Sequence, residues 1–199
     1  GALGFLAHGY LAAERHHGMQ AASKPRGECG ILSAREFLAR AVPMTQIDFY
    51  ILPDTTLEAR LEFACRLAET IHAKGFRLHV HVEDEAMARQ FDEHLWQFRP
   101  ESFVPHALDI DLDMAAREAE HADDVPRPPV TIGWQDAPAP GIEALLNLHP
   151  EIPEWFSRFE RVAEIINQHQ DVLVTKRECW RTYKSRGYAV RSHQLKGVS

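Results

Sequence analysis

The sequence predicts an α/β domain built on a layered, mostly parallel sheet. Short β-rich runs alternate with stretches of helical periodicity from about residue 45 to residue 188. Several of these runs end at Pro, Gly or Asp, which are typical of the turns between elements. Hydrophobic residues make up 45% and charged residues 26% of the 199-residue chain, which is enough apolar material for one buried core.

Each element follows from a local pattern. The expected strands cover 47–52, 78–82, 130–134, 144–148 and 162–166. The expected helices run from Thr55 or Thr56 to Gly75, over 85–97, briefly after Pro153, and over 171–186. The segment 144–148 is ambiguous by period, but its length and the proline that follows favour a strand.

Two segments fall outside this alternation. Residues 1–43 are rich in Ala, Gly and His and end at Pro43, so we expect an extension outside the core domain 44–199. Met44 is a plausible native start, and a genuine docking arm is the alternative for the extension. Residues 109–129 are acidic and then rich in proline, which predicts a surface loop.

The net charge of −7 is unevenly distributed. Residues 176–199 contain seven Lys or Arg and a single acid, Glu178, whereas the remaining residues carry a net charge of −13. An acidic body is a poor partner for phosphate backbones, which disfavours direct binding of nucleic acid. The basic end of the chain suits a short acidic peptide, a local piece of nucleic acid or simply a solvated helix face.

Cellular location follows from the cysteines and the hydropathy. Three widely spaced cysteines fit a reduced, cytoplasmic protein better than a disulfide scaffold. No run of 18 or more apolar residues occurs, so no membrane association is expected. Cys65 lies on the apolar stripe of its helix, where we expect an unreactive thiol.

Motifs for catalysis are nearly absent. The chain lacks the glycine-rich turns of dinucleotide and P-loop phosphate sites and the serine elbow of α/β-hydrolases, so no cofactor is expected. The exception is His79-Val80-His81, because alternate residues of a strand point to the same side and two imidazoles could bind one metal ion. A metal-dependent hydrolase using His79 and His81 is therefore the alternative function. Ordinary buried or surface histidines explain the same pattern.

From Gln46 onward the chain resembles the chi subunit family of the bacterial DNA polymerase III clamp-loader complex. The resemblance lies in the segments IDFYIL (47–52), GFRLHVHVED (75–84), LWQFRPESFVPH (95–106), VTIGW (130–134) and RECWRTYKSRGY (177–188). It implies a Rossmann-like α/β fold, a three-layer sandwich, in agreement with the pattern of elements.

The family resemblance implies a non-catalytic accessory subunit of DNA replication. Such a protein binds the psi subunit, which joins it to the clamp loader, and on a separate surface binds the acidic, Phe-terminated tail of single-stranded DNA-binding protein. It would contact DNA only indirectly. Psi is expected to need an exposed apolar patch on another side of the domain, for which Trp155 and Phe156 are the weak candidates.

The resemblance also implies the residues that bind the tail. Trp96 and Phe103 match aromatic residues that form an apolar slot, and Arg177 matches an arginine that binds the terminal carboxylate. Arg177, Trp180, Arg181 and Lys184 occupy positions i, i+3, i+4 and i+7 of the last helix, which places cations and an aromatic ring on one face.

Two residues depart from the family pattern. Leu173 stands where the family has a lysine, so that contact is absent or is shifted to Lys176. Trp180 stands where the family has a tyrosine, which keeps the aromatic surface but loses the hydroxyl. Both changes leave a tail site that differs in detail.

Overall fold

The computed structural model describes residues 44–99, 101–119, 121 and 125–196. Its strands are β1 (Gln46–Ile51), β2 (Leu78–His81), β3 (His106–Leu108), β4 (Val130–Gly133), β5 (Ala144–Asn147), β6 (Arg161–Ile166) and β7 (Ala189–Gln194). Its helices are α2 (Leu57–Ala73), α3 (Glu85–Gln97), α4 (Asp109–Glu118) and α5 (Gln170–Ser185), with a short 3-10 turn η2 (Phe156–Arg158). The expectation for residues 1–43 lies outside the described residues.

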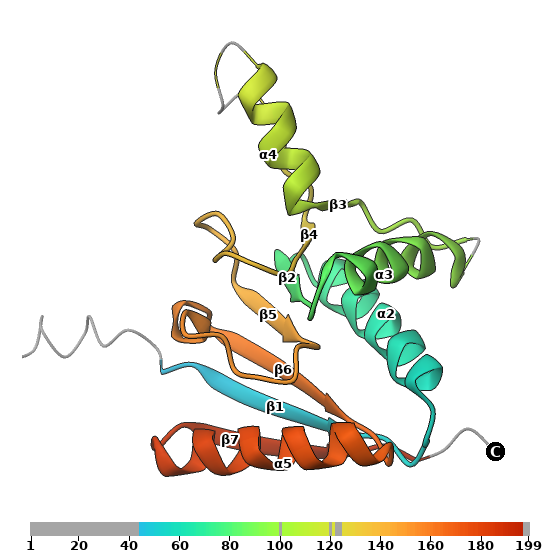
Figure 1. Ribbon diagram of the computed structural model, residues 1–199, viewed down its shortest axis with the longest axis vertical. Coiled ribbons are helices and arrows are strands. Elements are labelled where there is room, and N and C mark those ends of the chain that lie inside the picture. Colours follow the sequence, from blue (N-terminus) through green and yellow to red (C-terminus); the bar gives the residue numbers. More distant parts are fainter. Residues whose placement is uncertain (1–43, 100, 120, 122–124, 197–199) are drawn as a thin grey trace, which may run out of the picture. The chain divides into compact units, whose positions relative to one another are not determined.

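The seven strands form one parallel sheet in the order β3-β4-β2-β5-β6-β1-β7. The helices α2 and α3 pack on one face of the sheet, while α5 and η2 cover the other (Figure 1). The structure thus confirms the predicted α/β three-layer arrangement with a parallel sheet, and every expected strand and helix is present. Within the described residues no helix is long and apolar enough to cross a bilayer.

Local signals explain where the first helices begin. The Thr56 side chain accepts a hydrogen bond from the Ala59 amide at the start of α2, and Asp84 accepts one from Met87 at the start of α3. Such caps satisfy amides that have no partner inside the helix. Gly75, at φ 81°, follows α2 in a conformation that favours glycine.

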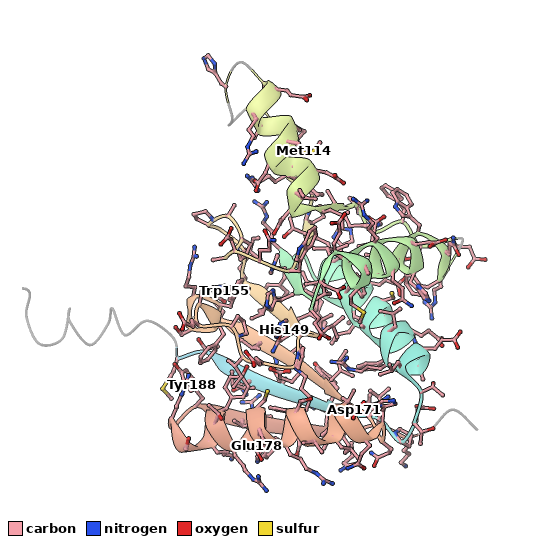
Figure 2. The ribbon with its side chains drawn as sticks, in the orientation of Figure 1. Met114, His149, Trp155, Asp171, Glu178 and Tyr188 are labelled. Carbon is pink, nitrogen blue, oxygen red and sulfur yellow. The ribbon has the colours of Figure 1, made fainter. Side chains whose placement is uncertain are left out.

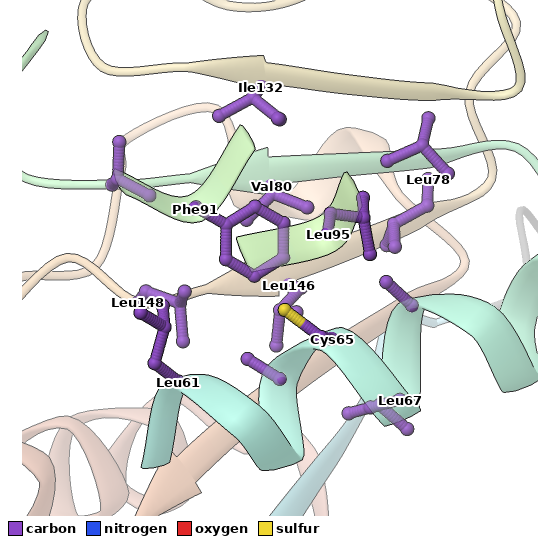
Figure 3. Packing of buried hydrophobic residues seen from close by; sticks show 14 of the residues in the cluster. Leu61, Cys65, Leu67, Leu78, Val80, Phe91, Leu95, Ile132, Leu146 and Leu148 are labelled. Atoms are coloured by element: carbon purple, nitrogen blue, oxygen red, sulfur yellow. The ribbon is translucent and has the colours of Figure 1, made fainter. Parts of the chain in front are cut away.

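Two hydrophobic clusters hold the layers together. Between the sheet and α2 and α3, apolar side chains such as Leu78, Phe91 and Leu146 are fully buried (Figure 3). On the other face, Phe49 and Leu145 of the sheet pack with Phe156 of η2 and with Cys179 and Tyr183 of α5. Both faces of the central strands are covered, and β5 (ALLN) and β6 (RVAEII) are accordingly rich in apolar residues, as a parallel sheet requires. The central strand β2 (LHVH) differs, because two buried histidines alternate with its apolar residues.

The prediction for residues 109–129 was wrong in part. The segment begins with the ten-residue helix α4, preceded by the three-residue strand β3, and the described residues between α4 and β4 form no helix or strand. Acidic residues in the first turn of α4 are favourable at a helix N-terminus, although they also resemble a solvated loop. The last strand, β7, was not predicted, because AVRSHQ is too polar to read as a strand.

Candidate protein-binding surfaces

One candidate surface is an exposed aromatic pair at the end of α3. Trp96 and Phe103 are 54% and 67% exposed, and their ring centroids lie 5.6 Å apart. The two rings lie next to each other, and their use as one binding site stays a prediction. His106 lies beneath, with its ring 4.8 Å from that of Trp96. Clustered aromatic side chains that remain exposed to solvent are typical of surfaces that bind another protein. This pair is therefore a candidate contact site for a partner.

The surroundings of this aromatic pair are acidic. Glu93 and Glu101 lie on the adjoining helix turn and loop and are exposed. Arg99 also lies nearby, but it pairs with Glu69 at 3.4 Å, so that three glutamates accompany this one arginine. A peptide rich in aspartate would meet repulsion here, since like charges in close contact disfavour binding. The patch suits a partner with apolar anchors instead.

The second candidate surface is one flank of α5. Trp180 is half-buried, with its ring 4.9 Å from that of Phe49, and the Lys184 ammonium lies 5.7 Å from the Trp180 ring centroid. Arg177 and Arg181 are exposed, and Arg181 pairs with Glu178. Figure 2 shows Glu178 on α5 and Tyr188 just beyond its end. This flank offers an aromatic ring fixed by the core and surrounded by cations, which fits an acidic peptide with an aromatic end.

The structure does not unite the two surfaces. α3 packs on β3 and β4 at one side of the sheet, whereas α5 packs on β6 and β7 at the other side and on the opposite face (Figure 1). Trp96 and Phe103 therefore lie on the opposite face of the sheet from the α5 residues, and which of these side chains bind the tail stays a prediction. At the usual spacing between neighbouring strands, β4 and β7 lie about 25 Å apart across the sheet, which also separates the two surfaces.

Lys176 is also not a surface cation. Its side chain is 1% exposed, and its ammonium donates to Glu164 Oε2 at 2.6 Å, His149 O at 2.6 Å and Asn147 O at 3.2 Å. All three ammonium hydrogens are thus occupied inside the protein. The suggested shift of the missing family contact from Leu173 to Lys176 is therefore not available, because the Lys176 ammonium is buried and all its hydrogens are engaged inside the protein.

Glu164 is the centre of this buried network, and sequence reasoning missed it. Its carboxylate is 0% exposed and also accepts hydrogen bonds from Asn147 Nδ2 and the Tyr183 hydroxyl, each at 2.9 Å. Burial, followed by the adjacent Glu164 charge, raises the pKa of Tyr183, which keeps the hydroxyl a donor. The signal was a lone glutamate inside the apolar strand RVAEII, since a buried carboxylate needs a cation.

The two histidines lie in the interior, and the described residues around them do not form a set of metal ligands. His79 and His81 lie side by side, with ring centroids 6.3 Å apart, and the Trp155 ring stands edge-on to both. Burial lowers the pKa of His79 to about 3 and that of His81 to about 4, with smaller contributions from neighbouring groups. Among the described residues, no three His, Cys, Asp or Glu side chains are placed to share a metal ion. The hydrolase alternative therefore gains no support.

The weak candidates for an apolar patch are not exposed. Phe156 is 3% exposed, and Trp155 is half-buried against the histidines, close to His149 in Figure 2. Both belong to the packing of the second cluster. Trp96 and Phe103 instead provide an exposed aromatic pair.

Comparison with known proteins gives a consistent result. A sequence model of the DNA polymerase III chi subunit family matches residues 44–191. The chain is 36% identical over 152 residues to DNA polymerase III subunit chi of Pseudomonas aeruginosa, covering 76% of this chain and 98% of that protein. It is 29% identical over 152 residues to the Escherichia coli subunit chi, covering 73% and 95%.

A more distant likeness concerns the fold alone. A crystal structure of T4 UvsW aligns with a TM-score of 0.53 and 7% identity, covering 76% of this chain and 41% of that one. Such low identity carries no information about activity.

Proposed function

Because the chain belongs to the DNA polymerase III chi subunit family, we propose that it is a non-catalytic accessory subunit of the polymerase III holoenzyme. Together with psi, it links the clamp loader to the C-terminal tail of single-stranded DNA-binding protein. The observation that carries the tail-binding role is the flank of α5, where Arg177, Trp180 and Lys184 combine cations with a fixed aromatic ring. The protein reaches DNA only through its partners.

The tail site consists of Arg177, Trp180, Arg181 and Lys184. The terminal carboxylate and the aspartates of the tail pair with the cations, and its last Phe packs on the Trp180 ring. Short peptides of this kind bind with micromolar affinity, about 8 kcal/mol. Added salt weakens the binding because the contacts are exposed and charged.

The exposed pair Trp96 and Phe103 is the surface for psi. Its acidic surroundings disfavour the tail, and its place on the other side of the sheet leaves the α5 flank free. One small domain can then hold both partners at once, as a linker must.

A peptide titration tests the tail role. The purified protein is titrated at low salt with an acidic nonapeptide ending in Pro-Phe, beside the same peptide without its final Phe. We expect micromolar binding that is lost without the Phe and weakens about 10-fold or more in Arg177→Ala, since a hydrogen bond to a charged group contributes about 1.5 to 3 kcal/mol. The matched control, Trp96→Ala, should bind the peptide as wild type does.

The same variants separate the two surfaces. Trp96→Ala with Phe103→Ala should abolish capture of psi, while Arg177→Ala should not affect it. Absence of tail binding at low salt would overturn the proposed tail-binding role. Loss of tail binding in Trp96→Ala would show instead that Trp96 belongs to the tail site.

A further inference from the structure

The strand β7 forms an open edge of the sheet beside the tail site. Among the described residues it pairs with β1 on one side, and no strand pairs with its other side. It has six residues, contains no proline, and is as long as β1 and β6. The opposite edge, β3, has three residues and packs against α3 and α4. A long, regular edge is a ready template for pairing with another extended chain.

Alternate residues of β7 present their backbone to this open side. The Leu195 amide donates to Ile51 O at 2.9 Å, so it points toward β1. With a period of two, the amides and carbonyls of Arg191 and His193 also face β1. Those of Val190, Ser192 and Gln194 point outward. Within the part of the chain that the structure describes, no strand takes up the outward donors and acceptors of these three residues.

The basic flank of α5 faces the same edge. Cys179 donates to Pro150 O at 3.3 Å, just after β5, so this flank of α5 faces the middle of the sheet. At 100° per residue, Arg177, Trp180 and Lys184 lie on the other flank. They therefore face the outer edge, where Val190 of β7 belongs to the same cluster as Trp180.

The charge around this edge selects the partner. Arg191 and Lys196 are exposed along and just beyond β7, and residues 176–196 carry seven Lys or Arg against Glu178. A second copy of this chain paired through β7 would bring two such basic sets together, which is unfavourable. An extended acidic peptide is the complementary occupant.

We propose that an acidic peptide held by the α5 flank continues as an eighth strand along β7, hydrogen-bonded to the backbone of Val190, Ser192 and Gln194. This inference rests on the proposed tail-binding function and adds how the residues before the final Phe are bound. Backbone pairing supplies affinity without demanding a particular side-chain sequence, whereas Arg177 and Trp180 read the end of the peptide.

Peptides methylated at single backbone amides test the pairing. The Pro-Phe nonapeptide is compared with versions N-methylated at successive residues before the proline, which leave every side chain unchanged. We expect affinity to fall about 10-fold at alternate positions and to stay within 2-fold at the positions between them. Uniformly small effects would overturn the added strand while leaving the tail role intact, whereas failure of the unmodified peptide to bind would overturn both.

A pair of variants tests the protein side. Ser192→Pro removes an amide that points away from β1, and the matched Ser192→Ala keeps it. We expect Ser192→Pro to lower the affinity for the peptide about 10-fold and Ser192→Ala to leave that affinity unchanged. Hydrogen exchange of wild type gives a readout independent of the variants, and the Ser192 amide should be protected by added peptide. Unchanged exchange at Ser192 under saturating peptide would overturn the inference.

Discussion

Replacing Lys176 by methionine should destabilise the fold strongly. The side chain lies 1% exposed against Glu164, which is 0% exposed, with 2.6 Å between ammonium and carboxylate. The variant leaves a buried carboxylate with only the neutral donors Asn147 and Tyr183. Removing one partner of a buried ion pair costs about 3 to 5 kcal/mol because the remaining charge is uncompensated. At about 3 °C per kcal/mol for a domain of this size, Tm should fall by about 10 to 15 °C.

Urea unfolding followed by circular dichroism measures this change. Lys184→Met is the matched control, an exposed lysine two turns later on α5, and it should change the free energy of unfolding by no more than about 0.5 kcal/mol. In a Glu164→Gln background, Lys176→Met should cost at least about 2 kcal/mol less, because no carboxylate remains to be paired. A cost below about 1 kcal/mol for Lys176→Met alone would refute the reasoning and show that water reaches Glu164.

Three further predictions concern the interior. His79, with its pKa lowered to about 3, stays neutral in the fold while it protonates near pH 6.5 when unfolded, so stability is lost as pH falls below 6.5. From pH 7 to pH 5 the wild type should lose about 2 kcal/mol relative to His79→Asn in urea titrations, and an equal pH dependence of the two proteins would contradict this. Burial raises the pKa of Cys65 to about 12 and that of Cys179 to about 11, so mass spectrometry should find neither alkylated by iodoacetamide at pH 8 until urea unfolds the chain. Phe91→Ala should cost about 3 to 5 kcal/mol by opening a cavity between α3 and the sheet, and a cost below 1 kcal/mol would mean that the site collapses.

Local patterns predicted the fold well where they were strong. Apolar β-rich runs and side-chain caps act within a few residues, so β1, α2, β2 and α3 follow from the sequence directly. Short or polar elements could not be predicted from local patterns. β3 has three residues, and β7 is a polar segment that becomes a strand because β1 supplies its hydrogen-bond partners.

The candidate sites likewise divide into features that the local sequence predicted and features that depend on the whole fold. The residue types of the α5 flank and of the aromatic pair were identified from the sequence. Whether they share a site depended on which face of the sheet each crossover covers, a property of the whole chain. The prediction for Lys176 failed because adjacent helix positions differ by about 100° in direction, so Lys176 points into the core while Arg177 points to solvent.

The sequence by itself determined the class of fold, the family and the positions of most elements, because these depend on periodicity and on shared residues over most of the chain. Only the tertiary structure decided that Trp96 with Phe103 and Arg177 with Trp180 lie on two surfaces, that Lys176 neutralises Glu164, and that β7 is the open edge of the sheet among the described residues. These depend on contacts between residues far apart in the chain, and no local pattern specifies which of the possible pairs will meet.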